Sequence, residues 1–266
     1  MNLKFNQEVS KHGKKDAVIA LCFFVFMLLS SLVPGIIMRA SGVGFQLDHL
    51  SLLIFFAVNL AVALAIILIK YKNIASIGLG KKKIGSALRL GFAFSLIPIA
   101  ISVALGLING WGANPLGSVV LILLMFLFYA ACEDIIFIGF IQTRLYGLFK
   151  TDKVAIFVGG ALFTLIHIPI RLVANGFSVV EFMTIPFWFF MYVVMVSLFK
   201  RHFSLFAVTI FHTSHNFWAT NQLWESGWGM TAWVSFGVVV AIESIWQWHL
   251  KRREGKRDMP HKTVEG

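Results

Sequence analysis

Long apolar stretches recur along the chain, and short polar or Gly/Pro-containing segments separate them. A helix of about 20 apolar residues crosses the hydrocarbon core of a bilayer, so the pattern predicts transmembrane helices. The stretches cover residues 17–38, 50–69, 87–108, 116–149, 154–172, 184–199, 203–220 and 230–250. The sequence therefore predicts an all-α, polytopic transmembrane bundle of about eight spans, forming a single integral membrane domain over residues 1–266.

Two stretches depart from a simple crossing. Residues 116–149 are longer than a span requires, so this helix is expected to tilt or to project beyond the bilayer. Residues 74–89 mix Ile and Leu with lysines, which favours an amphipathic segment on the inner membrane surface.

The charged residues predict the orientation. Basic clusters occupy residues 11–15, 70–83, 150–153, 200–202 and 251–257. The intervening loops 39–49, 109–115, 171–181 and 221–229 contain only two Lys or Arg residues, Arg39 and Arg171. Because Lys and Arg are enriched in cytoplasmic loops, the basic side is expected to be cytoplasmic, and eight crossings place both termini there.

Composition supports the membrane interpretation. Hydrophobic residues make up 58% of the chain and charged residues 13%, about half the charged fraction of an ordinary soluble domain. The net charge of +11 comes from clusters between the apolar stretches and not from one basic face, which argues against nucleic acid as a partner. The expected partners are membrane lipid and a peptide or protein substrate.

Several predicted spans contain ionisable or amide side chains, which are costly in hydrocarbon and therefore indicate function. At about 1.5 Å per residue, Glu133, His167 and His212 lie roughly 25, 21 and 16 Å from the basic ends of their helices. All three can therefore share a level near the middle of the membrane. The complete set of candidates is Glu133, Asp134, His167, His212, His215 and Asn216.

These residue types suit hydrolysis within a membrane. A carboxylate can take a proton from water, and imidazoles can orient that water or protonate a leaving amine. Asn216 lies four residues after His212, on the same helical face, where an amide could stabilise an oxyanion. Two alternatives remain: Glu133, His167 and His212 could bind zinc, or Glu133 and Asp134 could be a structural or proton-coupled pair.

The motifs and their order resemble those of the CPBP family of intramembrane proteases, also called the Abi or CAAX prenyl protease 2-like family, which includes proteins like lysostaphin resistance protein A. The family pattern has a Glu-Glu-x-x-x-Arg motif, a Phe-x-x-x-His motif and a His-x-x-x-Asn motif on separate helices. Here the corresponding segments begin at Glu133, at Phe163 and at His212, and the similarity covers about residues 115–220.

The resemblance implies a metal-free endopeptidase that requires no cofactor. It implies that Glu133 activates water, that His167 and His212 assist, and that Asn216 stabilises the oxyanion. Asp134 and His215 are expected to support these four residues. Many family members are bacterial, which favours the plasma membrane of a bacterial cell.

The chain departs from the family pattern at two positions. The second acid is Asp134 in place of Glu, and Ile138 replaces the arginine that would pair with it one turn along the helix. Asp134 is therefore expected to be protonated, hydrated or paired with a distant cation. Arg144 lies about 15 Å further along and is interpreted as an anchor at the cytoplasmic end of the helix.

Two other function classes compete with the protease. A non-catalytic family member could act by binding, as a bacteriocin-immunity or envelope-regulating protein, and Ile138 motivates this alternative. A transporter is disfavoured because two matching halves with interrupted helices are not evident.

Overall fold

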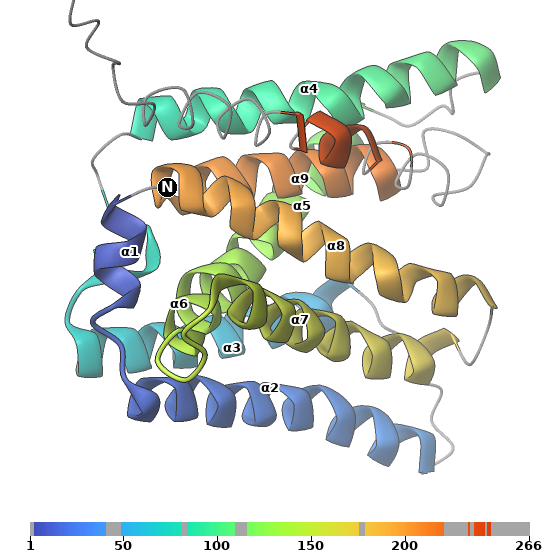
Figure 1. Cartoon of the computed structure of the whole chain (residues 1–266). Helices are drawn as coiled ribbons and strands as arrows, with labels where there is room; N and C mark the ends of the chain where they lie inside the picture. The colour runs from blue at the N-terminus through green and yellow to red at the C-terminus, as the bar shows by residue number, and fades with distance from the viewer. Residues whose placement is uncertain are drawn as a thin grey trace, which may run out of the picture.

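The computed structural model describes residues 3–40, 49–80, 84–109, 116–175, 179–220, 234, 237–242 and 244–245. Every regular element in these residues is helical (Figure 1). The elements between residues 3 and 220 are α1 (Leu3–Val9), α2 (Lys14–Ala40), α3 (His49–Ile66), η1 (Ile67–Tyr71), η2 (Ile74–Ile77), α4 (Ile84–Asn109), α5 (Leu116–Glu133), η3 (Asp134–Ile141), α6 (Gln142–Leu145), α7 (Asp152–Asn175), α8 (Val179–His202) and α9 (Leu205–Thr220).

Six helices in the described part of the chain are long and apolar enough to cross a membrane. They correspond to the first six predicted spans, which confirms a polytopic helical bundle. Their apolar windows are Lys14–Leu32, Leu52–Tyr71, Ile84–Ala104, Val119–Leu145, Asp152–Pro169 and Thr184–His202. The eighth predicted span, residues 230–250, lies mostly outside the described residues.

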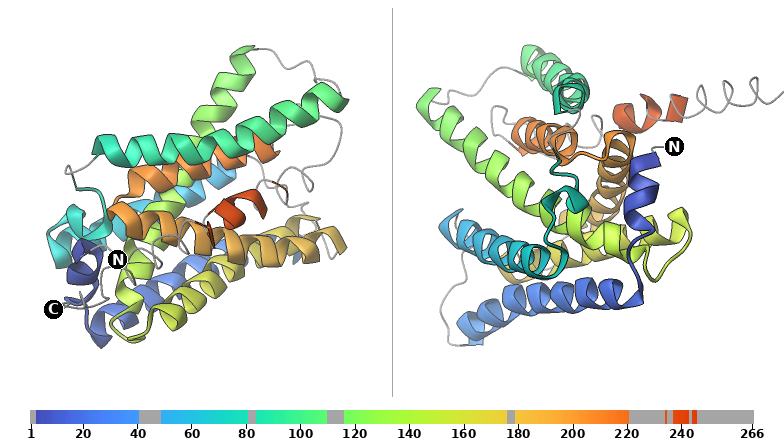
Figure 2. Two further views of the ribbon diagram at one scale, coloured as in Figure 1. Left: turned by 45° about the horizontal axis from the view of Figure 1, so that its top comes forward. Right: turned by 90° about the vertical axis from the view of Figure 1, so that its left-hand side faces the viewer.

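The seventh predicted span is α9, which has 16 residues and is therefore about 24 Å long. This length is short for a crossing of about 30 Å. α9 packs against α4, α5 and α8, and Figure 2 shows it enclosed among them. Most of its side chains between residues 205 and 217 are buried, so α9 is a central helix that protein covers on several sides.

The long fourth stretch changes helix type where its acids begin. It runs as the α-helix α5 to Glu133, as the eight-residue π-helix η3, and as the short α-helix α6. The Gln142 N–H donates to the carbonyl of Phe137, five residues earlier, as a π-helix requires. Wide turns of this kind are frequent at functional sites.

The segment after η1 differs from the expectation. Residues 74–77 form the 3-10 turn η2, in which Ser76 and Ile77 are buried, and α4 begins at Ile84. η2 packs against η3 because Gly139 has no side chain: a Cβ there would lie 2.9 Å from the carbonyl oxygen of Ile77. Ser76 and Ile77 therefore belong to the bundle interior, and the prediction of a surface segment was wrong for these two residues, whereas Ile74 and Ala75 are exposed.

The N-terminus adds a helix that hydropathy did not predict. α1 precedes the first span, and Phe5 is buried in contact with the rings of Tyr146, Phe199 and Phe203. Phe5 thereby packs α1 against the segment that follows α6 and against the basic end of α8. The short helix was missed because it is polar apart from three apolar side chains.

A row of aromatic rings crosses the core and positions the helices that carry the candidate site. Phe24 of α2 contacts Phe137 of η3 at 6.4 Å between ring centroids, and Phe137 contacts Phe163 of α7 at 5.2 Å. Phe163 then contacts Tyr192 of α8 at 5.4 Å. Such ring pairs contribute about 0.5–1.5 kcal/mol each beyond the burial of their surface. They hold η3 against α7, one turn from His167.

Candidate active site

The two candidate acids lie at the junction of α5 and η3. Glu133 is the last residue of α5 and Asp134 the first of η3. The Glu133 side chain is 12% exposed and the Asp134 side chain 1% exposed. Asp134 is thus buried inside the bundle and Glu133 is largely covered, so each carboxyl group needs a polar neighbour.

Glu133 lies between imidazoles from two other helices. Its Oε1 is 3.8 Å from Nε2 of His167 on α7, and its Oε2 is 3.6 Å from Nε2 of His212 on α9. Both distances exceed a direct hydrogen bond. The structure therefore brings together three of the residues predicted to share one depth, with the two ring nitrogens on either side of the carboxyl group.

Asp134 is hydrogen-bonded from α9. The hydroxyl of Thr209 donates to its Oδ2 over 2.8 Å, and Nδ1 of His212 is 3.1 Å from its Oδ1. An ionised carboxylate can only accept, so Nδ1 of His212 donates to Asp134, and Nε2 of the same ring faces Glu133. His212 thereby connects the two acids.

His167 is oriented by its own helix and by α8. Its Nδ1 is 2.7 Å from the carbonyl oxygen of Phe163, which can only accept a hydrogen bond, so Nδ1 donates. Its ring stacks on Trp188 with 4.8 Å between centroids and an interplanar angle of 22°. These two contacts direct Nε2 toward Glu133.

The departure at position 138 has a structural explanation. Ile138 is fully buried and belongs to the hydrophobic core. The second acid, which the family pattern pairs with an arginine, is hydrogen-bonded here by Thr209 and His212. Asp134 therefore does not depend on a distant cation.

Arg144 lies elsewhere than expected. It is fully buried, and its guanidinium donates to the Ser76 hydroxyl over 2.9 Å and to the Thr143 hydroxyl over 2.5 Å. It also lies 4.5 Å from the centroid of the Tyr71 ring. The interpretation of Arg144 as an anchor in the membrane interface was wrong: it connects α6 to η1 and η2 inside the protein.

The remaining candidates lie along α9. His215 is buried beside the rings of Phe187 and Phe211, at 5.5 and 6.0 Å between centroids. Asn216 is half-buried and occupies the face of α9 that carries His212, one turn further along. Both residues thus belong to the helix that supplies His212.

Two residues of the site escaped the sequence analysis. Thr209 precedes His212 by three residues, so the helical spacing was a usable signal, but a threonine in an apolar stretch is common. Trp188 lies on a separate helix, and nothing in its sequence neighbourhood connects it to His167.

The neighbouring Cys132 is buried and free. Within the described residues, no three His, Cys, Asp or Glu side chains are grouped in a way that could hold a metal ion. The site thus contains the carboxyl groups of Glu133 and Asp134, the imidazoles of His167 and His212, the Thr209 hydroxyl and the Trp188 indole.

Comparison with known families agrees with the motifs. Residues 115–218 match the model of Rce1-like type II CAAX prenyl endopeptidases. No curated protein and no solved structure matches the chain. The matched segment contains α5, η3, α7, α8 and nearly all of α9, and with them all the residues of the site. The resemblance is thus confirmed over residues 115–218, where this integral membrane protein matches the Rce1-like domain of CAAX prenyl endopeptidases (CPBP family).

Proposed function

We propose that this protein is an endopeptidase that hydrolyses a peptide bond in a membrane-associated peptide or protein, with water activated by Glu133. The family supports a membrane protease of the CAAX type in general. The observation that carries the finer proposal is the position of Glu133, with a carboxyl oxygen 3.6 Å from one imidazole nitrogen and the other 3.8 Å from a second.

In the proposed reaction, Glu133 takes a proton from water and the resulting hydroxide attacks the carbonyl carbon of the substrate. The carbonyl double bond opens to an oxyanion, for which the side-chain amide of Asn216 is the proposed hydrogen-bond donor. The carbon–nitrogen bond then breaks, the oxyanion re-forms a carbonyl, and the proton held by Glu133 passes to the amine. Atoms and charges balance without a cofactor.

The supporting residues have distinct roles in this proposal. Asp134 fixes His212 through Nδ1, and Thr209 fixes Asp134. Trp188 and the carbonyl of Phe163 fix His167. These contacts keep both Nε2 atoms directed at the region where the water and the scissile bond would meet, so little reorganisation precedes the reaction.

The test compares the full chain with Glu133→Gln in liposomes that contain a library of quenched fluorescent peptides with lipid anchors. General base catalysis contributes about 10²–10⁴-fold, so the variant is expected to lose at least about 10²-fold in cleavage rate. Cys132→Ala is the matched control, because it alters the buried neighbour of Glu133 and should retain cleavage. Equal rates for the wild type and Glu133→Gln would contradict the proposal.

A second candidate is a non-catalytic member of the family that protects the cell against a bacteriocin or regulates its envelope. Ile138 in the arginine position favours it. Expression in bacteria challenged with a panel of peptide bacteriocins separates the two. Protection that persists in both Glu133→Gln and His167→Ala supports binding, whereas protection lost in both supports hydrolysis.

A further inference from the structure

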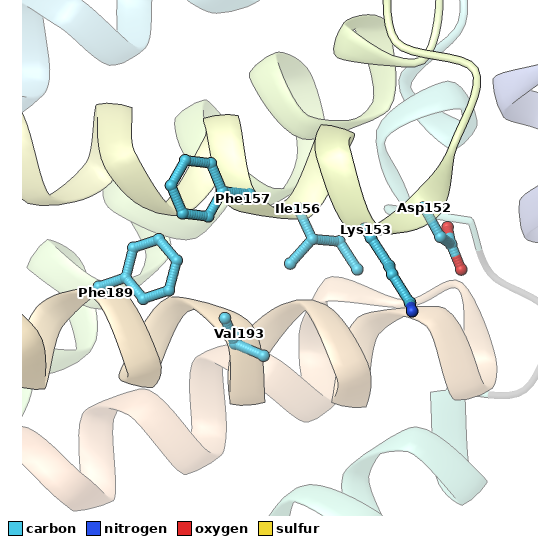
Figure 3. A pocket seen from close by; sticks show the side chains of 6 residues that line it. All are labelled: Asp152, Lys153, Ile156, Phe157, Phe189 and Val193. Atoms are coloured by element: carbon cyan, nitrogen blue, oxygen red, sulfur yellow. The ribbon is translucent and has the colours of Figure 1, made fainter.

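A groove lies between α7 and α8, away from the candidate active site. Its volume is about 370 Å³. Figure 3 shows that its walls come from one side of each helix, with the apolar side chains along its length and the charged ones at one end. The lining residues are Asp152, Lys153, Ile156, Phe157, Phe189 and Val193.

The groove follows from the way the two helices meet. Gly159 and Gly160 let α7 approach α8 closely, since a Cβ at Gly160 would lie 2.9 Å from the Phe189 ring. Outside this contact, Phe157 and Phe189 meet at 5.4 Å and 65° and leave a furrow beside them. Phe157 is 63% exposed on a helix that can span a membrane, so the furrow opens toward lipid.

The charged end of the groove carries an excess of positive charge. Asp152 forms an ion pair with Lys200 and accepts a hydrogen bond from the Tyr146 hydroxyl. Lys153 is exposed and forms no ion pair with the residues that the structure describes. Lys150 and Arg201 lie near the same ends of α7 and α8. The acid is therefore neutralised, and the Lys153 ammonium is available to an anion.

We propose that this groove binds one anionic phospholipid of the cytoplasmic leaflet. One acyl chain lies along Ile156, Phe157, Phe189 and Val193, and the phosphate contacts Lys153. Basic sites between transmembrane helices on the cytoplasmic side are suited to anionic headgroups, and an apolar furrow beside them accepts the chain. The positive-inside pattern places residues 150–153 and 200–202 on that side.

Other occupants fit the groove less well. A peptide strand would leave backbone N–H and C=O groups against apolar walls, where each unpaired group is costly. A soluble anion would contact only Lys153 and would bury no apolar surface against the four apolar side chains. A zwitterionic headgroup would bring a cationic group close to Lys153 and Lys200, which lowers the net attraction. The lipid site is independent of the proposed peptide hydrolysis, because none of its lining residues belongs to that site.

The experiment measures lipids retained by the full chain after extraction, using native mass spectrometry. The probes are dioleoyl phosphatidylglycerol and dioleoyl phosphatidylcholine in equimolar amounts. The wild type should retain one phosphatidylglycerol in preference to phosphatidylcholine. Lys153→Gln removes the anion contact and Val193→Phe fills the furrow, so each should lower the retained fraction at least fivefold. Lys14→Gln, at the exposed start of α2, should leave it unchanged.

Four results would overturn the proposal. Equal retention of the two lipids by the wild type would show that the charge at the groove confers no selectivity. An equal loss in Lys14→Gln and Lys153→Gln would indicate attraction by total charge and no defined site. Displacement of phosphatidylglycerol by millimolar inorganic phosphate would indicate an anion site that does not use the apolar furrow. Retained binding in Val193→Phe together with loss in Lys153→Gln would lead to the same conclusion.

Discussion

The bundle contains two clusters of buried polar side chains, and their contacts differ in kind. The Arg144 guanidinium makes hydrogen bonds of 2.5–3.4 Å to four oxygen atoms and lies against two aromatic rings. The Glu133 carboxyl group instead lies 3.6 and 3.8 Å from the ring nitrogens of His212 and His167.

The difference indicates that the Arg144 cluster stabilises the fold, whereas the Glu133 cluster is arranged for a reaction. Burying a charge is costly in both places, and close hydrogen bonds offset that cost around Arg144. Around Glu133, the close hydrogen bonds are made by its neighbours: by Asp134 and by the Nδ1 atoms of the two imidazoles, which point away from Glu133. The carboxyl oxygens of Glu133 and the Nε2 atoms of the two histidines are too far apart for direct hydrogen bonds, and this spacing suits contact with a bound molecule. Substitutions in the two clusters should therefore affect different properties.

The largest effect is expected for His212, which contacts both acids. His212→Ala should lower the cleavage rate by about 10³-fold, because the variant loses a nitrogen beside Glu133 and a donor to Asp134. The loss is measured as the rate at which the protein in liposomes cleaves a substrate peptide. Thr213→Val is a matched control, since Thr213 is a buried neighbour on α9 with no contact to either acid among the hydrogen bonds of the described residues. Similar losses in both variants would mean that disruption of α9 explains the effect.

Arg144→Leu should mainly lower stability, by about 3 kcal/mol, because it leaves Ser76 and Thr143 without their charged donor. The free energy of unfolding in mixed micelles measures this loss. At a temperature where the variant is folded, its cleavage rate should remain within about threefold of the wild type. A variant that is fully stable but inactive would place Arg144 in the chemistry and remove the distinction between the two clusters.

A smaller effect is expected for Thr209. Thr209→Val keeps the shape of the side chain but removes the donor to Asp134, which should cost about 1.4 kcal/mol, or about tenfold in rate. Thr209→Ser restores the hydroxyl and should recover most of the rate. Equal rates in all three proteins would show that Thr209 does not position the acid.

The mildest expected effect is on the dependence of stability on pH. Burial, and secondarily the nearby Arg144 charge, lower the pKa of His12 to about 4. The unfolded chain therefore binds a proton between about pH 6.5 and 4 that the folded chain does not, so stability falls as pH falls through this window. His12→Gln should reduce the slope of the unfolding free energy against pH by up to about 1 kcal/mol per pH unit between pH 4 and 6.5. Thermal unfolding at several pH values measures this slope. An unchanged slope would contradict a neutral His12 in the fold.

The sequence predicted the main features of the bundle and the identity of its reactive side chains. An apolar stretch of spanning length has few alternatives to a helix, and ionisable residues inside such stretches are conspicuous. Glu133, Asp134, His167 and His212 were found in this way, and the structure brings them together.

The features that were missed depend on information that hydropathy does not contain. The π-helix is a change of backbone hydrogen-bond register, which leaves the apolar pattern unaltered. The burial of Arg144 depends on Ser76, 68 residues away, and on the close approach that Gly139 permits. Contacts between distant segments of this kind decide whether a charged side chain reaches the membrane surface or remains inside.

The π-helix η3 has a genetic consequence. Loss of a single codon within residues 134–141 would let the segment tighten into an α-helix with little rotation of the residues on either side, because a π-turn accommodates one residue more than an α-turn. Loss of a codon within α5 has no wider turn to relax, so the residues before it would rotate by about 100° relative to Glu133. The alignment of the two acids with their histidines should therefore tolerate a lost codon in η3 better than one in α5.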